Sequence, residues 1–249
     1  MNATLIIMGA TIREFVRQPG VLILLGLSAL ASGGGWLWRD FNFGMDDTRF
    51  LLSLGWGIQG FVSTVFAVVA VAQTYAREFD QGTAMLFRTR AVSPFAVMVG
   101  KAGGVWVMIA GFMVISSLWL ILVVVGSGGD VVAIVILAHL GSSLAKLGLV
   151  IAFTTWFASY GRSVVFVVLA SGGLLILGHL HPLLLGSGAW ARGLGLLLPD
   201  LHWFGGPGAS EIVESSGIGV TLARKWTYAG VYGITFFWLG TLAWRRRED

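Results

Sequence analysis

The sequence contains no cysteine, so a disulfide framework, a thiolate metal site and a cysteine nucleophile are all excluded. Charged residues are also scarce, at 11% of the 249 residues, while hydrophobic residues make up 56% and the mean hydropathy is +0.85. A soluble domain carries about 25% charged residues. The shortage of charge and the long apolar runs therefore predict an all-α integral membrane protein.

The sequence also lacks a complete nucleotide-binding motif. Gly100-Lys101 resembles the end of a P-loop, but Phe95 and Ala102 stand where that loop needs Gly and Ser or Thr. No long apolar stretch contains a pair of Asp residues, and the sequence shows no metal-ligand cluster of His and no Ser–His arrangement that predicts catalysis. We therefore expect this chain not to be an enzyme and to bind no metal or cofactor of its own.

Six apolar stretches are long enough to cross a bilayer, which requires about 20 predominantly apolar residues in a helix. They are Val21–Trp38, Leu51–Tyr75, Pro94–Val125, Val131–Ala158, Ser163–Leu183 and Trp226–Trp244. The sequence thus predicts a single transmembrane domain, residues 1–249, with six spans.

The Lys and Arg residues lie mostly at the ends of these stretches, so the net charge of +4 orients membrane helices rather than binding nucleic acid. With the N-terminus inside, ten of these cations fall in inner segments and five in outer ones. Because cytoplasmic segments are enriched in Lys and Arg, both termini are predicted to be cytoplasmic.

Residues 1–19 precede the first stretch and are predicted to form a helix in the inner membrane interface. Their apolar residues recur at helical spacing, with Arg13 and Arg17 on another side, and Gln18-Pro19-Gly20 ends the pattern. The apolar members are Leu5, Met8, Ile12, Phe15 and Val16.

The segment between the second and third stretches is the most elaborate polar part of the chain. Gly82 permits a sharp turn, and the Thr83 hydroxyl can cap a short helix that runs to Arg90. That helix would present Leu86 as an apolar contact and Arg88 as a second charge. The pattern predicts a transverse coupling helix on the cytosolic surface.

This coupling segment, residues 76–93, ends where the next helix begins. Ser93 can serve as the N-cap of that helix and Pro94 as its first residue. A helix from Pro94 to Val125 would be about 48 Å long, which exceeds the roughly 30 Å hydrocarbon core. Its first turns are therefore expected to project into the cytosol.

These features resemble the type-2 ABC exporter permeases, which have an N-terminal interfacial helix, six spans and a conserved motif after the second span. The residues that match this motif are Glu78, Gly82, Thr83, Leu86, Ser93, Pro94, Gly100 and Lys101. The run Leu197–Asp200 before Phe204, and an Arg cluster after the last span, resemble the branch associated with copper-enzyme maturation and gliding motility. The resemblance covers the whole chain.

The resemblance implies the transmembrane subunit of an ATP-driven exporter in the bacterial cytoplasmic (inner) membrane. ATP and Mg would bind separate cytosolic ATPase subunits, and a second permease copy would complete a dimer surrounded by membrane lipids. The residues implied to contact the ATPase are Glu78, Gly82, Thr83, Leu86, Arg88 and Arg90.

Residues 186–225 form the longest predicted segment outside the spans. Leu194–Leu198 is too apolar for a free loop, and the whole segment is too short to cross the bilayer and return. We expect short re-entrant helices in the outer leaflet.

Lys146 is the cation that the sequence places inside a span, about half-way along Val131–Ala158. A Lys at this depth costs about 2.5–3.5 kcal/mol on the insertion scale, and no predicted span holds an Asp or Glu to pair with it. Its partner could be Gln59, a backbone carbonyl, water in a cavity, a neighbouring subunit or an anionic substrate. Lys146 and Gln59 therefore mark either a transport pathway or subunit seam, or a structural hydrogen bond. The four histidines are interpreted as interfacial residues, since His179 and His181 are two apart and do not face one another on a helix.

Two other functions remain open. A haem-exporter permease of cytochrome c maturation has a similar size and a similar loop, although Leu197–Asp200 and the Arg-rich end fit the first branch better. A membrane anchor or assembly factor would recruit enzymes and transport nothing. The coupling segment argues against an anchor, and absence of a bound ATPase would favour it.

Overall fold

The computed structural model describes residues 3–35, 37, 46–80, 93–130, 132–160, 163–186, 188–205 and 217–246, and all regular structure in these ranges is helical. The all-α prediction is therefore confirmed for this part of the chain. The helices are α1 (Ala3–Val16), α2 (Pro19–Gly34), α3 (Asp47–Asp80), α5 (Pro94–Gly126), α6 (Ala133–Tyr160), α7 (Val164–His179), α8 (His181–Gly186), α9 (Ala189–Leu197), the 3-10 turn η2 (His202–Phe204) and α11 (Ile218–Arg245).

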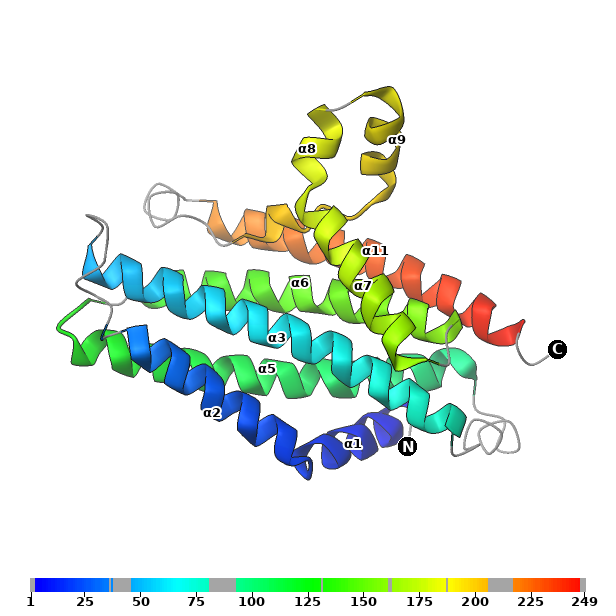
Figure 1. Ribbon diagram of the computed structural model, residues 1–249, viewed down its shortest axis with the longest axis horizontal. Coiled ribbons are helices and arrows are strands. Elements are labelled where there is room, and N and C mark those ends of the chain that lie inside the picture. Colours follow the sequence, from blue (N-terminus) through cyan, green and yellow to red (C-terminus); the bar gives the residue numbers. More distant parts are fainter. Residues whose placement is uncertain are drawn as a thin grey trace.

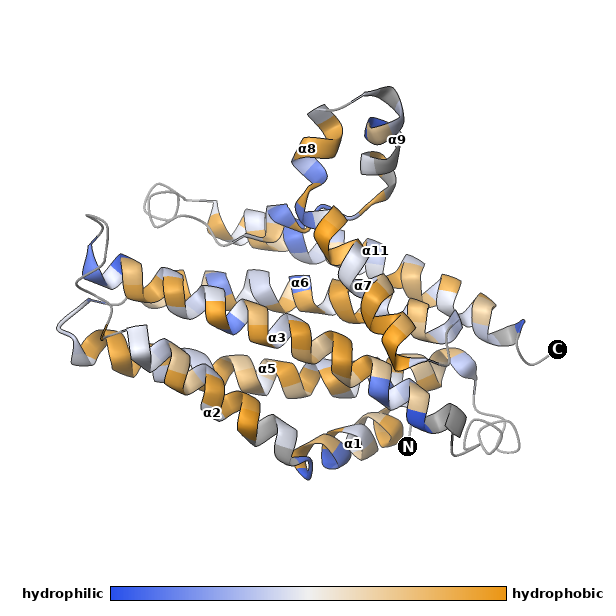
Figure 2. Ribbon diagram, in the orientation of Figure 1, coloured by the Kyte–Doolittle hydropathy of each residue, from blue (hydrophilic) through white to orange (hydrophobic). Residues whose placement is uncertain are grey.

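Three helices are long and apolar enough to cross a membrane: Asp47–Arg77 of α3, Pro94–Gly126 and Ala133–Tyr160. Shorter apolar helices run over Ile23–Gly34 and Val164–His179. Figure 2 shows mostly hydrophobic residues in the middle of α2, α3 and α5, and hydrophilic ones toward helix ends. These helices fit an integral membrane protein.

The long helices lie roughly along one direction, with α1 folded back beside α5 at one end (Figure 1). The described ends of the chain lie at this same end of the bundle, as do the end of α3 and the start of α5. Ser93 begins α5 as predicted, because its Oγ accepts a hydrogen bond from the Ala96 N–H at 3.2 Å and Pro94 follows in the first turn.

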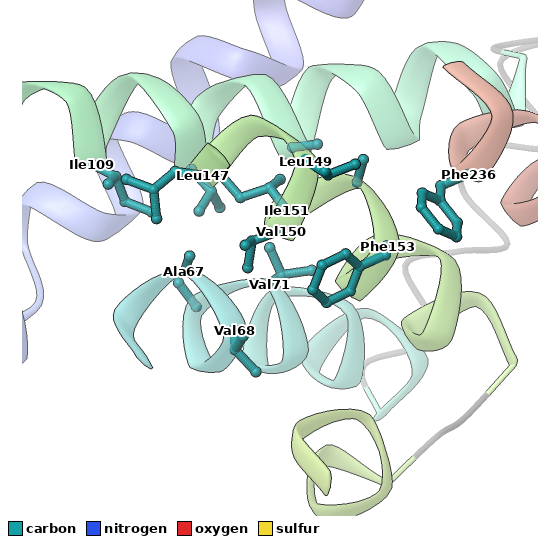
Figure 3. Packing of buried hydrophobic residues seen from close by; sticks show 14 of the residues in the cluster. Ala67, Val68, Val71, Ile109, Leu147, Leu149, Val150, Ile151, Phe153 and Phe236 are labelled. Carbon is teal, nitrogen blue, oxygen red and sulfur yellow. The ribbon is translucent and has the colours of Figure 1, made fainter. Parts of the chain in front are cut away.

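The hydrophobic core is centred on α6, which packs against α3, α5, α7 and α11. From Leu149 to Phe153 every side chain of α6 is buried, so this helix is surrounded on all sides. Val71 of α3, Ile109 of α5 and Phe236 of α11 close around it (Figure 3). The described part of the chain thus shares one main core.

Glycines allow α1 to approach α5 closely. A Cβ at Gly100 would lie 2.9 Å from the Thr4 carbonyl oxygen, and one at Gly104 would lie 2.7 Å from Thr11 Cβ. The predicted helix over the first residues is thus confirmed, and its packed face includes buried Thr11 and Phe15. Leu5 and Val16, predicted on the same apolar face as Phe15, are 56% and 60% exposed.

The segment after α7 leaves the bundle and returns to it at the same place. Helices α8 and α9 stand away from the long helices in Figure 1. The chain then comes back at Leu201, which is fully buried and whose N–H donates to the Gly178 carbonyl at 3.1 Å. The Asp200 N–H donates to the Tyr228 hydroxyl at 2.7 Å, which fastens the return to α11.

On this side of the fold the helix ends lie at other residues than two of the predicted boundaries. The fifth apolar stretch was expected to run to Leu183, but α7 ends at His179, and α8 begins at His181. The outer segment was predicted to run to residue 225, and the first turns of α11, from Ile218, lie within that range. Arg224 and Lys225 interrupt the apolar pattern there without interrupting the helix.

Replacing Gly104 by Ala tests the packing of α1 on α5. The added methyl group would lie 2.7 Å from Thr11 Cβ and 3.0 Å from the Met8 carbonyl oxygen, so α1 must shift. We expect the free energy of unfolding to fall by about 1–3 kcal/mol, measured as a lower Tm of the detergent-purified protein. Gly111→Ala on the same helix meets no atom within 4 Å and should not lower Tm, because Ala is the better helix former. Equal melting temperatures for the two variants would contradict this packing.

Candidate functional site

The predicted coupling residues fall mostly in a part of the chain that the structure does not describe. Gly82, Thr83, Leu86, Arg88 and Arg90 lie outside the described residues. Glu78 lies in the last turn of α3, but nothing is described of its side chain. Their contact with an ATPase remains a prediction.

The helix ends that flank this segment are held together. Arg77, near the end of α3, donates from Nη1 to Glu14 Oε1 of α1 at 2.7 Å. Helix α1 packs in turn on the first half of α5 through Gly100 and Gly104. The end of α3 and the start of α5 are therefore joined through α1.

The second turn of α5 is covered by neighbouring helices, whereas Phe95 in the first turn is 50% exposed. Lys101 is 6% exposed, and its Nζ lies 5.6 Å from the centre of the Tyr75 ring, which is an arrangement for a cation–π contact. Tyr75 meets Trp244 of α11 edge to face at 6.1 Å. Gly100-Lys101 thus lies inside a junction of α1, α3, α5 and α11, while the projection of the first turns of α5 into the cytosol remains a prediction.

A cavity of about 570 Å³ lies between α3, α6, the end of α7 and η2. Its wall on α3 extends from Arg49 to Thr64, and its wall on α6 from Val135 to Leu147. Phe204 and Gly205 border it near η2. At 1.5 Å per residue the α3 wall is about 22 Å long.

Lys146 lines this cavity and binds His179. Its Nζ lies 2.8 Å from His179 Nε2, while His179 Nδ1 lies 2.8 Å from the Leu175 carbonyl oxygen. A carbonyl only accepts, so Nδ1 carries the proton, and Nε2 accepts from the Lys146 ammonium. The histidine therefore holds the ammonium in place without neutralising its charge.

The sequence analysis missed His179, although helix lengths place it beside Lys146. Helices α6 and α7 follow one another and pack together, with only residues 161–163 between them. Lys146 lies about 21 Å before the end of α6, and His179 about 22 Å after the start of α7. A comparison of these two distances would have predicted that Lys146 and His179 lie at the same level. Considering each apolar stretch separately could not predict this pair.

Gln59, considered above as a partner of Lys146, contacts α5 instead. It is 2% exposed, and its Nε2 donates to the Met113 carbonyl at 2.7 Å and to Ser117 Oγ at 2.9 Å. Gln59 therefore links α3 to α5, while Lys146 bonds His179. Nothing in the described contacts joins Gln59 to Lys146.

A second histidine lines the same cavity. The His139 ring stacks on Trp56 with centroids 4.3 Å apart, and its Nε2 lies 3.3 Å from Ser143 Oγ. This stack joins α3 to α6 at the cavity wall. The described residues hold no group of three or more His, Cys, Asp or Glu side chains that could bind a metal ion.

Lys146 is not the only cation within the helices. Lys101 of α5 and Lys225 of α11 are both more deeply buried, at 6% and 4% exposure. Lys225 donates to Ser142 Oγ at 3.3 Å and to the Gly205 carbonyl at 3.4 Å, and it is not among the residues that line the cavity. Lys101 lies within Pro94–Gly126, a helix long and apolar enough to cross a membrane, so Lys146 is not the one cation within such a helix.

No protein-family model matches this chain, and no curated protein matches it either.

The lysines Lys146 and Lys225 should differ in their effect on stability. Lys225→Met removes the bonds that join α11 to α6 and η2, so we expect a loss of about 1.5–3 kcal/mol in the free energy of unfolding. Lys146→Met should change it by less than about 1 kcal/mol, because the lost bond is offset by removal of an ammonium from an apolar bundle. Thermal unfolding of the purified variants measures both effects. A loss in Lys146→Met as large as that in Lys225→Met would identify Lys146 as a structural cation.

Proposed function

We propose that this chain is the transmembrane (permease) subunit of a bacterial ATP-driven exporter of the type-2 ABC kind. It would act as a dimer with a second permease copy and with cytosolic ATPase subunits that bind ATP and Mg. The observation that carries the proposal is the continuity of α3, which reaches from the cavity to the start of the predicted coupling segment.

Helix α3 is 34 residues long, or about 51 Å at 1.5 Å per residue. Its last residues, 76–80, are the first residues of the coupling segment, and its first half forms the cavity wall from Arg49 to Thr64. A force on the coupling segment would therefore tilt the wall of the cavity. Glu14 and Arg77 would carry the same force to α1, and from there to α5.

The proposed arrangement in the membrane has six spans, namely α2, α3, α5, α6, α7 and α11, with α1 in the inner interface. Both termini would face the cytoplasm, and the described ends of the chain lie at one end of the bundle (Figure 1). Helices α8 and α9 would enter the outer leaflet. Movement of α3 against α6 and α7 would then expose the cavity to the outer side.

Cysteine labelling tests the topology, because the natural chain contains no cysteine. In intact cells, Asp249→Cys should resist a membrane-impermeant maleimide and react only after permeabilisation. Ser210→Cys, in the predicted outer segment, should react in intact cells and so serves as the control. Labelling of Asp249→Cys in intact cells would overturn the proposed orientation.

Leu86→Asp tests the coupling segment. The new charge would enter an apolar contact with the ATPase, at a cost of about 3–5 kcal/mol if it is left unpaired. We expect the ATPase to be lost from affinity-purified permease while the permease still inserts into the membrane. Tyr160→Asp places the same charge on an exposed aromatic at the end of α6 and should leave the ATPase bound.

If Leu86→Asp retains both ATPase association and transport, the coupling assignment is wrong. If no ATPase accompanies even the wild-type chain, a non-transporting anchor becomes the better explanation.

A further inference from the structure

Among the residues that the structure describes, the wall of the cavity beside α3 has cationic groups and no carboxylate. Arg49 and Lys146 are its charged lining residues in this part of the chain, and no described Asp or Glu lines it. Within the described chain, no salt bridge pairs either cation with a carboxylate. The nearby Asp200 carboxylate contacts other residues: its Oδ2 lies 3.5 Å from His181 Nδ1, and its Oδ1 accepts a hydrogen bond from the Trp203 N–H. The cavity therefore favours an anion.

Lys146 has the geometry of an anion-binding group. An ammonium has three N–H donors, and the described contacts give this one a single partner, His179 Nε2. The Leu175 carbonyl holds the His179 ring by its Nδ1–H, which fixes the position of Nζ. Two donors therefore remain for a ligand at a preorganised point on the cavity wall.

The rest of the lining is apolar and suits a hydrocarbon chain. Trp56, Phe61 and Phe204 contribute aromatic rings to it. Gly57 and Gly60 leave open space on the α3 side, because a Cβ at either would meet no atom within 4 Å. A volume of about 570 Å³ lies within the range of small-molecule sites, about 300–1,000 Å³.

The apolar wall of α3 continues onto the outside of the bundle. Gly57 is exposed, and Phe61 is 71% exposed although it lines the cavity. In a membrane this face of α3 would lie against acyl chains. A ligand dissolved in the bilayer could thus enter sideways past Gly57 and Phe61.

We propose that this cavity binds an anionic amphiphile, a molecule with a phosphate or carboxylate head and a hydrocarbon tail. The head is held by the Lys146 ammonium, and the tail lies along Trp56 and Phe61 toward the exposed face of α3. Arg49, about 22 Å from Thr64 along the α3 wall, supplies a second cation toward the other end of the cavity. Binding stands on the cavity alone, while the role of this molecule as the exported substrate rests on the proposed function.

Fluorescence quenching in phosphatidylcholine nanodiscs tests the proposal. The probes are phosphatidic acid, phosphatidylcholine and a fatty acid, each brominated on its acyl chain. The chain has 11 Trp residues, so the difference between wild type and Trp56→Phe isolates the signal of Trp56. Brominated phosphatidic acid should quench this signal at an about ten-fold lower mole fraction than brominated phosphatidylcholine, the effect of about one charge-assisted hydrogen bond.

The variants determine which residue carries this preference. Lys146→Met should abolish the preference for the anionic lipid, and Lys146→Arg should retain it, which controls for misfolding. Arg224→Met removes one positive charge at an exposed position of α11 outside the cavity lining and should leave the preference unchanged. Equal quenching by phosphatidic acid and phosphatidylcholine, or an undiminished preference in Lys146→Met, would overturn the proposal.

The remaining arms identify the source of the anion. Quenching by the brominated fatty acid as strong as that by phosphatidic acid would assign the site to anionic lipids in general. Loss of the phosphatidic acid signal on addition of inorganic phosphate alone would show that the site recognises the free anion, and would overturn the role of the tail. If the chain binds the lipid but no ATPase associates with it, the proposed exporter function is refuted and the binding site stands. If no lipid binds although the ATPase complex works, the binding site is refuted and the exporter function stands.

Discussion

The length of α7 is the constraint on which the cavity depends. Helix α6 is about 42 Å long and α7 about 24 Å, and α7 follows α6 after residues 161–163 and packs against it. Helix α7 therefore stops about half-way along α6 and leaves Val135, His139 and Ser143 without cover from it. The return of the chain at η2 covers this face only in part, and the cavity is the space that remains.

The same constraint explains why a cation can reside at this depth. Where α7 ends, its last turn offers a histidine whose backbone bond leaves Nε2 free to accept. An ammonium in hydrocarbon is costly, but at this point it has an acceptor on one side and a cavity on the other. Lys225 illustrates the contrasting solution, in which a lysine is buried against hydroxyl and carbonyl oxygens in the packed bundle.

The sequence was sufficient to predict those structural features that depend on residues close to one another along the chain. Ser93 and Pro94 begin a helix because a cap and a fixed φ act within one turn, and the first residues form a helix because their apolar spacing is helical. The Lys146–His179 pair depends on the relative depth of two helices, and the burial of Lys101 depends on the packing of α3, which places the Tyr75 ring beside it. Hydropathy also began the sixth apolar stretch at Trp226, later than α11 begins, since Arg224 and Lys225 appear polar in the sequence although Lys225 is buried by tertiary contacts. Of the candidate site, Lys146 could be found from its cost in a span, but its partner and the cavity required the packed fold.

The bond between the Leu201 N–H and the Gly178 carbonyl joins the two ends of the excursion, the segment that contains α8 and α9, so this segment is structurally independent of the bundle. Both ends of the excursion are fixed close together at the bundle, by this bond and by the bond from the Asp200 N–H to the Tyr228 hydroxyl, so the bundle depends little on the length of chain beyond them. The entropy of closing a loop rises slowly with its length, and an inserted or shortened excursion would therefore disturb the fold little. Related chains would be free to diverge most in this module, and a reporter domain grafted between α8 and α9 would leave the cavity intact.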